Sequence, residues 1–112
     1  MVVYALGQIG DAAATRDLIN VLRDGNELPE VRGMAAEALA MINAKDAIVP
    51  LIAALSDRSP EVRFWSVFAL GQLRAKEALP ELKRLVAEDH YEISGYHSVS
   101  QEAAAAIEVI NG

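Results

Sequence analysis

The sequence predicts an all-α fold: an α–α superhelix, or solenoid, of about three and a half helix–turn–helix repeats of ~31 residues. Two segments carry the prediction, PEVRGMAAEALAMINAKDAIVPLIAALSD from Pro29 and PEVRFWSVFALGQLRAKEALPELKRLVAE from Pro60. They begin 31 residues apart, and a fixed period of this size is typical of proteins whose repeats stack on one another. Apolar residues at helical spacing indicate two helices in each copy.

Composition limits the chain to one domain and narrows the classes of partner. The 112 residues carry a net charge of −6, from 16 acidic and 10 basic residues, whereas nucleic-acid binding needs a concentrated basic surface. The absence of cysteine excludes disulfides and thiolate metal sites. No apolar run approaches the ~18 residues of a membrane span, and the N-terminus lacks the pattern of a signal peptide. We therefore expect a cytoplasmic protein that binds neither nucleic acid nor membrane.

The first unit, residues 1–28, aligns with the second at an offset of 33 residues, and the opening of its first helix is missing. Gly10-Asp11 ends that helix, and Asp11 is the expected N-cap of a second helix from about Ala12 to Arg23. Its buried positions are Ala14, Leu18, Ile19 and Leu22. Because the chain starts inside a unit, we expect it to be a fragment of a longer array.

The second and third units, 29–59 and 60–98, follow one plan. Pro29 and Pro60 sit in the first turn of a helix, and Ser59 is the expected N-cap of the later one. The second helices should start at Asp46, with Pro50 in the first turn, and at Lys76, continuing to about Glu88. The predicted buried stripes are Val31, Ala35, Ala38, Leu39 and Ile42 in one unit and Val62, Ser66, Ala69, Leu70 and Leu73 in the other.

The last unit, residues 99–112, holds only an opening helix. Val62 and its counterpart Val99 are 37 residues apart, so the segment 89–98 is an insertion. Ser98 is the expected N-cap, with Gln101 placed for a capping box. The apolar face of this helix should need a packing partner beyond the preceding unit, either a continuing array or self-association through uncapped ends; its members are Ala103, Ala106, Ile107 and Ile110.

The repeated line V-R-x-x-A-A-x-A-L-x-x-I-x-A-K-x-A, followed by L-x-x-x-L-x-D, resembles the short HEAT-like repeats of the phycobilisome lyase (PBS lyase) type. The residues that carry it are Val31-Arg32, Ala35-Ala36, Ala38-Leu39, Ala47, Leu51, Leu55 and Asp57, recurring at Val62-Arg63, Ala69-Leu70-Gly71, Ala78, Leu82 and Val86. The resemblance implies a right-handed superhelix with opening helices on the convex side and second helices on the concave side. Proteins with such repeats include bilin lyase subunits, scaffold proteins and many uncharacterised proteins.

One enzymatic branch of such repeats, deoxyhypusine hydroxylase, holds a di-iron site with His-Glu pairs just after the Val-Arg position. The matching pairs here are Gly33-Met34, Phe64-Trp65 and Gln101-Glu102, and none contains histidine. Iron needs imidazole and carboxylate ligands from several units at once, so this resemblance implies no iron site in this stretch.

Recurring Asp and Arg residues predict a structural ladder at the turns between units. Asp57 and Arg63 lie six residues apart, and Asp24 with Arg32 is a similar arrangement. Recurrence in each unit fits an Asp that accepts backbone N–H groups at a helix start and pairs with a neighbouring Arg. An exposed charged ridge that meets a partner is the alternative.

The third unit alone departs from its template with aromatic and histidine residues. Phe64, Trp65 and Phe68 lie off the buried stripe, so part of this face should point outward as a contact patch; alternatively, it covers the neighbouring opening helix or packs under the insertion. The insertion 89–98 adds His90, Tyr91, Tyr96 and His97. Its histidines with Asp89 or Glu92 match no known metal-ligand spacing, so we expect a surface loop and no metal or cofactor.

We expect a non-catalytic protein–protein interaction scaffold whose partner is a protein segment. The predicted surface is the exposed side of the second helices: Arg16, Asn20, Arg23, Ala53, Ser56, Lys83 and Arg84. The alternative, which rests on the resemblance, is a subunit of a bilin lyase or chromophore-handling protein in which Trp65, Tyr91 and Tyr96 with Arg63 contribute to a tetrapyrrole pocket. A third interpretation is a designed or excised array with no activity.

Overall fold

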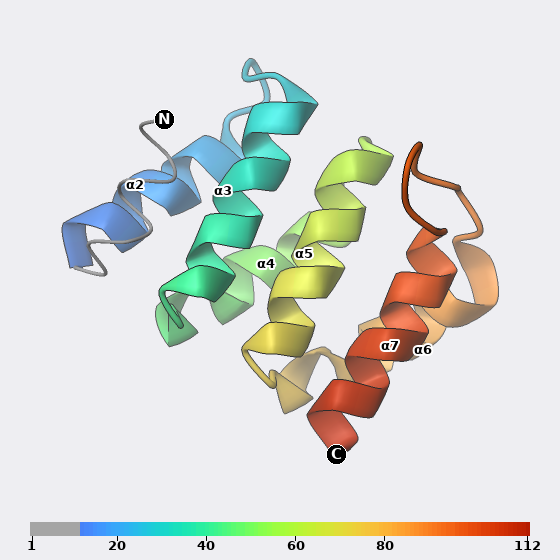
Figure 1. Cartoon of the computed structure of the whole chain (residues 1–112). Helices are drawn as coiled ribbons and strands as arrows, with labels where there is room; N and C mark the ends of the chain where they lie inside the picture. Colours follow the sequence, from blue (N-terminus) through green and yellow to red (C-terminus); the bar gives the residue numbers. More distant parts are fainter. Residues whose placement is uncertain (1–11) are drawn as a thin grey trace.

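A computed structural model describes residues 12–112, in which six α-helices and two short 3₁₀ helices form two layers (Figure 1). The first helices of the units, α3 (Pro29–Met41), α5 (Pro60–Gln72) and α7 (Val99–Asn111), lie side by side in one layer. The second helices, α2 (Ala12–Arg23), α4 (Ile48–Ala54) and α6 (Leu79–Glu88), form the other. None of the helices in this described part is long and apolar enough to cross a membrane.

Helix packing between the layers takes place mainly between neighbouring units. Helix α5 packs between α3 and α7, and each second helix packs against the first helix of the next unit: α2 on α3, α4 on α5 and α6 on α7. Each unit therefore completes its core against its neighbour, as the 31-residue period predicted. The predictions for residues 2–11 lie outside the described residues.

Proline position explains how the second helices α4 and α6 start. The helices expected from Asp46 and Lys76 begin instead with 3₁₀ turns, η1 (Lys45–Ala47) and η2 (Lys76–Ala78), before α4 and α6. Pro50 and Pro80 have no N–H to bond the carbonyl four residues earlier, so that turn cannot be regular α-helix. The first turns of α3 and α5 contain Pro29 and Pro60 without such a cost, because N–H groups there are unpaired in any helix.

The N-cap predictions divide between the two serines. Ser98 forms the predicted capping box: Gln101 N–H donates to its hydroxyl at 3.1 Å, and its own N–H donates to the Gln101 side chain at 2.9 Å. Ser59 occupies the N-cap position of α5 but makes no capping bond, so that prediction was wrong in its chemistry. Its hydroxyl donates to Glu61 Oε1 at 3.0 Å instead.

The core is mainly aliphatic and buries most of the apolar face of the last helix. Fully buried leucines run through all described α-helices except α7, whose contribution to the apolar core is Val99, Ala103, Ala106 and Ile110. These residues are buried against α5 and α6, and Ala106 lies so close to Gly71 that a Cβ at Gly71 would stand 2.9 Å from the Ala106 Cβ. The expectation that Ala103, Ala106, Ile107 and Ile110 need a partner beyond the preceding unit was wrong for all but the half-buried Ile107, because small side chains let α7 approach α5 closely.

Candidate functional site

The insertion 89–98 folds back on itself between α6 and α7. Glu92 and Ser98 form an isolated antiparallel bridge, and Tyr96 N–H donates to the Ile93 carbonyl at 2.9 Å. Gly95 supplies the positive φ of 83° that the tight turn requires. The buried side chain of Ile93 anchors the segment. A hydrogen bond at its base, from Ser100 N–H to the Asp89 carbonyl at 2.7 Å, anchors it as well. The insertion is therefore a shaped element that presents Ser94 and Tyr96 at its tip.

The aromatic residues of the third unit pack under this insertion. Phe64, only 2% exposed, lies with its ring 5.5 Å from Tyr96 and 5.6 Å from His97. The interpretation of Phe64 as part of an outward patch was wrong, because the insertion covers it. Trp65 and Phe68 are half-buried neighbours with ring centroids 5.6 Å apart.

Trp65 is the centre of this aromatic cluster of Phe64, Trp65, Phe68 and Tyr96. Its ring meets the other three nearly edge-to-face, at centroid distances of 5.2 to 5.6 Å. A Cβ placed on Gly33 would lie 2.8 Å from Trp65 Cδ1, so the glycine of α3 makes room for the indole. Of the two alternatives, covering the neighbouring opening helix describes Trp65, and packing under the insertion describes Phe64.

Beside the cluster, helices α3 and α5 and the tip of the insertion enclose a groove of about 390 Å³. The groove is open on one side and combines acidic, aromatic and aliphatic side chains. Its lining residues are Glu30, Met34, Glu37, Glu61, Trp65, Ile93, Ser94 and Tyr96. Thus two of the sequence-predicted site residues, Trp65 and Tyr96, meet at one site.

The sequence reasoning missed the acidic part of this groove. Glu30, Met34 and Glu37 line the groove from one face of α3, and Glu61 and Trp65 occupy the equivalent positions 31 residues later. A signal was present, because residues i, i+4 and i+7 lie on one helix face, and a repeat places the same face of successive helices side by side. The carboxylates were overlooked because glutamates at helix surfaces are usually only solvated.

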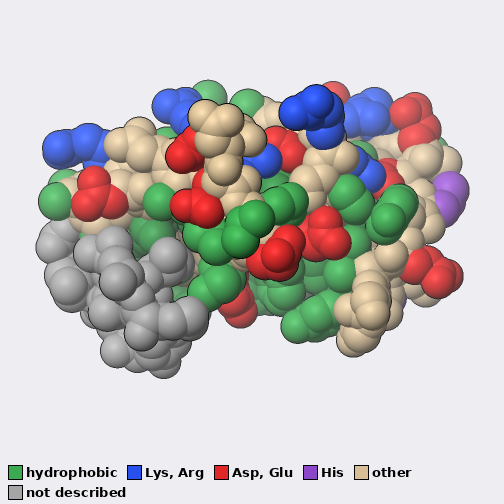
Figure 2. Space-filling model, turned by 90° about the horizontal axis from the view of Figure 1, so that it is seen from above, with side chains coloured by type: hydrophobic (Ala, Val, Ile, Leu, Met, Phe, Trp, Pro, Cys, Tyr) green, Lys and Arg blue, Asp and Glu red, His purple; other side chains and the backbone are tan. Residues whose placement is uncertain are grey.

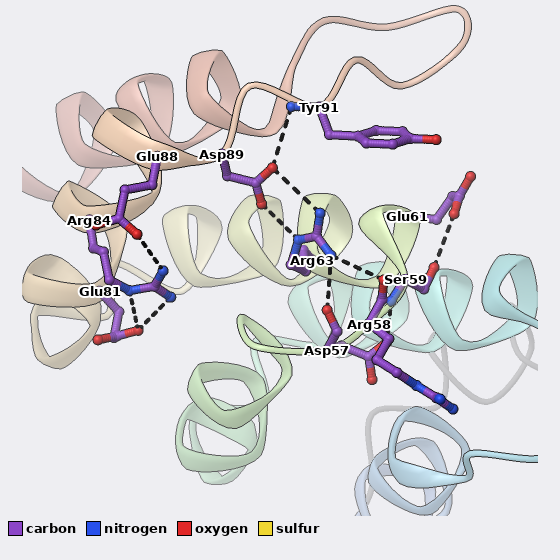
Figure 3. Close-up of polar contacts among 10 residues, drawn as sticks. All are labelled: Asp57, Arg58, Ser59, Glu61, Arg63, Glu81, Arg84, Glu88, Asp89 and Tyr91. Atoms are coloured by element: carbon purple, nitrogen blue, oxygen red, sulfur yellow. Dashed lines mark hydrogen bonds and ion pairs between the residues drawn. The ribbon is translucent and has the colours of Figure 1, made fainter.

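The Asp and Arg residues do form ion pairs, but each arginine pairs with the aspartate one unit later in the chain than predicted. Arg32 forms a bidentate ion pair with Asp57, with nitrogen–oxygen distances of 2.5 and 3.2 Å. Arg63 forms the same kind of pair with Asp89, at 2.7 and 3.4 Å. Arg63 reaches the backbone carbonyl of Asp57 at 2.9 Å and not its carboxylate, which corrects the predicted Asp57–Arg63 pair (Figure 3). Each arginine thus ties its own unit's first helix to the end of its second helix.

The aspartates of the ladder also accept backbone N–H groups two residues later, which for Asp57 is the predicted bond at a helix start. Asp24 accepts from Asn26 and Asp57 accepts from Ser59, both at 2.9 Å. Partial burial alone would raise the pKa of the Asp57 carboxyl, but hydrogen bonds from Arg32 and Ser59 and the nearby arginine charges together hold that pKa below its ordinary value. The ladder is therefore a set of paired groups that stabilises the turns between units.

Six of the seven residues predicted on the second helices are exposed, and the seventh, Arg84, is half-buried and already paired. Arg84 donates to Glu81 at 3.0 Å and to Glu88 at 3.3 Å along its own helix (Figure 3), and its hydrogen bond to Glu81 raises the pKa of the guanidinium. The remaining predicted positions of this surface are exposed: Arg16, Asn20, Arg23, Ala53, Ser56 and Lys83. They form a mixed, open surface.

The two histidines are held apart by different partners. His97 Nε2 lies 2.5 Å from Glu102 Oε1, whereas His90 Nε2 lies 3.1 Å from the Ala87 carbonyl. Asp89, a metal-ligand candidate in the sequence, is occupied by Arg63. Across residues 12–112, no three His, Cys, Asp or Glu side chains are grouped as a metal site would require. Tyr91 is exposed and lies outside the groove.

Comparison with known families agrees with the repeat architecture. A family model described as HEAT repeats matches residues 15–108, and one described as PBS lyase HEAT-like repeat matches residues 1–24. No curated protein matches the chain.

Proposed function

This chain belongs to the family of HEAT-repeat proteins, and its repeats form a helical scaffold. We propose that it is a non-catalytic scaffold that binds a segment of another protein. The observation that carries the proposal is the groove of about 390 Å³ between α3, α5 and the insertion. Long insertions in repeat arrays often shape a binding face, and this one forms a wall of the groove.

The groove is favoured over the second-helix surface that the sequence first suggested. It is hollow and lined by half-buried Met34 and Trp65, which can bury an incoming side chain. The second-helix residues Arg23 and Lys83 are exposed to solvent, and Arg84 is already paired with Glu81. Charged groups at an open rim contribute little affinity, so a partner anchored in the groove gains more.

The chemistry of the groove supports binding and not reaction. A nucleophile needs a neighbouring base, and a metal catalyst needs several ligands at one point. The groove offers one hydroxyl side chain from Ser94 and a phenol from Tyr96, and no histidine lines it. Bilin handling has less support, because the propionates of a tetrapyrrole would meet Glu30, Glu37 and Glu61, and Arg63 is turned to Asp89.

Two tyrosines of the insertion allow a matched test. Tyr96 lines the groove and is 61% exposed, whereas Tyr91 lies outside it and is 57% exposed. The full chain, Tyr96→Ala and Tyr91→Ala would each be immobilised and used to capture proteins from extracts of the source cells by chemical cross-linking. We expect Tyr96→Ala to lose a captured protein that the full chain and Tyr91→Ala retain.

Equal helicity of the two variants by circular dichroism excludes loss of folding as the cause. A capture pattern that Tyr91→Ala changes and Tyr96→Ala does not would contradict the proposal. Capture of nothing by any of the three would contradict it as well.

A further inference from the structure

The groove carries a concentration of negative charge that the described residues, 12–112, leave without an ion pair. Glu30 and Glu37 on α3 and Glu61 on α5 contribute three carboxylates to its wall. Within residues 12–112, Glu30 and Glu37 have neither a hydrogen bond nor an ion pair through their side chains, and Glu61 accepts only the Ser59 hydroxyl. The arginines of this region are occupied elsewhere, Arg32 by Asp57 and Arg63 by Asp89.

The charged side chains are also divided by sign on one face of the molecule. In Figure 2, Lys and Arg side chains gather toward the upper edge of the view, whereas acidic and hydrophobic side chains adjoin one another in the centre. A cationic ligand approaching this face would meet attractive potential, and an anionic ligand would be repelled.

The spacing of the carboxylates suits an elongated side chain with a charged end. Glu30 and Glu37 are seven residues apart on α3, about 10 Å along the helix axis, with Met34 between them. Trp65 and Tyr96 line the opposite wall, their rings 5.4 Å apart. Aliphatic and aromatic carbons can cover the stem of a long side chain while a carboxylate receives its charged end.

We infer that the groove binds a basic segment of a partner protein through an arginine side chain, an inference that rests on the proposed function. Of the two long cations, arginine fits better: its planar guanidinium packs on aromatic rings, donates in two directions to carboxylates and is weakly hydrated. The lysine ammonium is a compact, strongly hydrated charge, which loses more hydration in a half-apolar groove.

The inference is tested with the full chain and fluorescent peptides in which Gly alternates with Arg, Lys or Glu. We expect the Arg peptide to bind more tightly than the Lys peptide, and the Glu peptide not to bind. The double variant Glu30→Gln and Glu37→Gln should raise the Kd of the Arg peptide about tenfold, since two attractive charges are lost without a change of shape.

A second double variant, Glu77→Gln and Glu108→Gln, is the matched control. It removes the same number of negative charges at exposed positions outside the groove, on η2 and α7. We expect it to change the Kd less than twofold at about 0.15 M salt, because charges beyond a Debye length of about 8 Å are screened.

An equal rise in the Kd of the Arg peptide for the two double variants would overturn the inference, since general attraction to an acidic protein would then explain binding. Binding of the Glu peptide would also overturn it. Light scattering that shows a dimer dispersed by Glu30→Gln and Glu37→Gln would do the same, because a second copy would then occupy the groove. If no peptide binds while Tyr96→Ala still loses a captured protein, only the arginine inference fails and the scaffold proposal stands.

Discussion

Units 29–59 and 60–98 share one framework but present different surfaces. Each has its proline-led first helix, its 3₁₀ start to the second helix and its Arg–Asp pair, Arg32–Asp57 in one and Arg63–Asp89 in the other. Their inter-helix turns also match, since Asn43 and Arg74 both have positive φ, 55° and 53°. These features recur because each unit must end its helices and join its neighbour in the same way.

The differences that change the surface lie on one face. Met34 and Glu37 of α3 become Trp65 and Phe68 in α5, and the insertion 89–98 follows α6. The aromatic side chains and the insertion depend on each other, because Tyr96 packs on Phe64 and Trp65. The comparison teaches that the framework can stay constant while a binding surface is built from a few off-core positions and one insertion.

The largest effect should come from the contact that fixes the insertion. Phe64→Ala removes a ring that is 2% exposed, and we expect a loss of about 3–5 kcal/mol in the free energy of unfolding. Urea denaturation gives the value, and faster amide exchange at Ile93 and Tyr96 would show that the insertion has loosened. A loss below about 1 kcal/mol would mean that the insertion does not depend on this ring.

The two glycines of the first helices should respond differently to alanine. A methyl group at Gly71 would meet the Cβ and Cα of Ala106 at 2.9 and 3.1 Å, and neither atom can turn away. Gly71→Ala should cost about 1–3 kcal/mol despite the better helix propensity of alanine. Gly33→Ala should cost less, because its methyl group meets the half-buried side chain of Trp65, which can shift toward solvent at the cost of some ring contacts, whereas Ala106 is fixed by the backbone of α7. Thermal unfolding of both variants would reveal an error in this order.

The ladder predicts a dependence on acid. The pKa of Asp57 lies below its ordinary value of 3.8, so its contribution to stability is complete above that pH and is lost as pH falls through the lower folded value. Asp57→Asn should cost about 1–3 kcal/mol at neutral pH and should flatten the loss of stability below pH 3.8. Urea denaturation between neutral pH and pH 3 or so tests both parts; an unchanged acid slope would contradict the role of this pair.

The smallest effect concerns a position where the units differ inside the core. Ser66 is fully buried with no hydrogen-bond partner for its hydroxyl, whereas the equivalent residue of the preceding unit is Ala35. Ser66→Ala should therefore raise the free energy of unfolding by about 1 kcal/mol. Loss of stability in this variant would show that the hydroxyl has a partner in solution.

Local signals in the sequence predicted the framework well. Pro29, Pro60 and the Ser98–Gln101 pair marked helix starts that the structure places at the same residues. The groove was predicted only in part: Trp65 and Tyr96 stood out by composition, but their meeting depends on how the insertion folds over Phe64. The shifted pairing of Arg32 with Asp57 likewise depends on the end of α4 reaching the start of α3, which no local pattern encodes.

Trp65 offers the most direct test of the central claim, because it is the only tryptophan in the sequence and lines the groove. Its fluorescence would be followed while the unlabelled peptide of alternating Gly and Arg is added to the full chain. The account predicts a saturable change in emission that the Glu peptide does not cause and that Glu30→Gln with Glu37→Gln shifts to about tenfold higher concentration. Saturable binding of the Arg peptide, measured independently, with no change in Trp65 emission would contradict it.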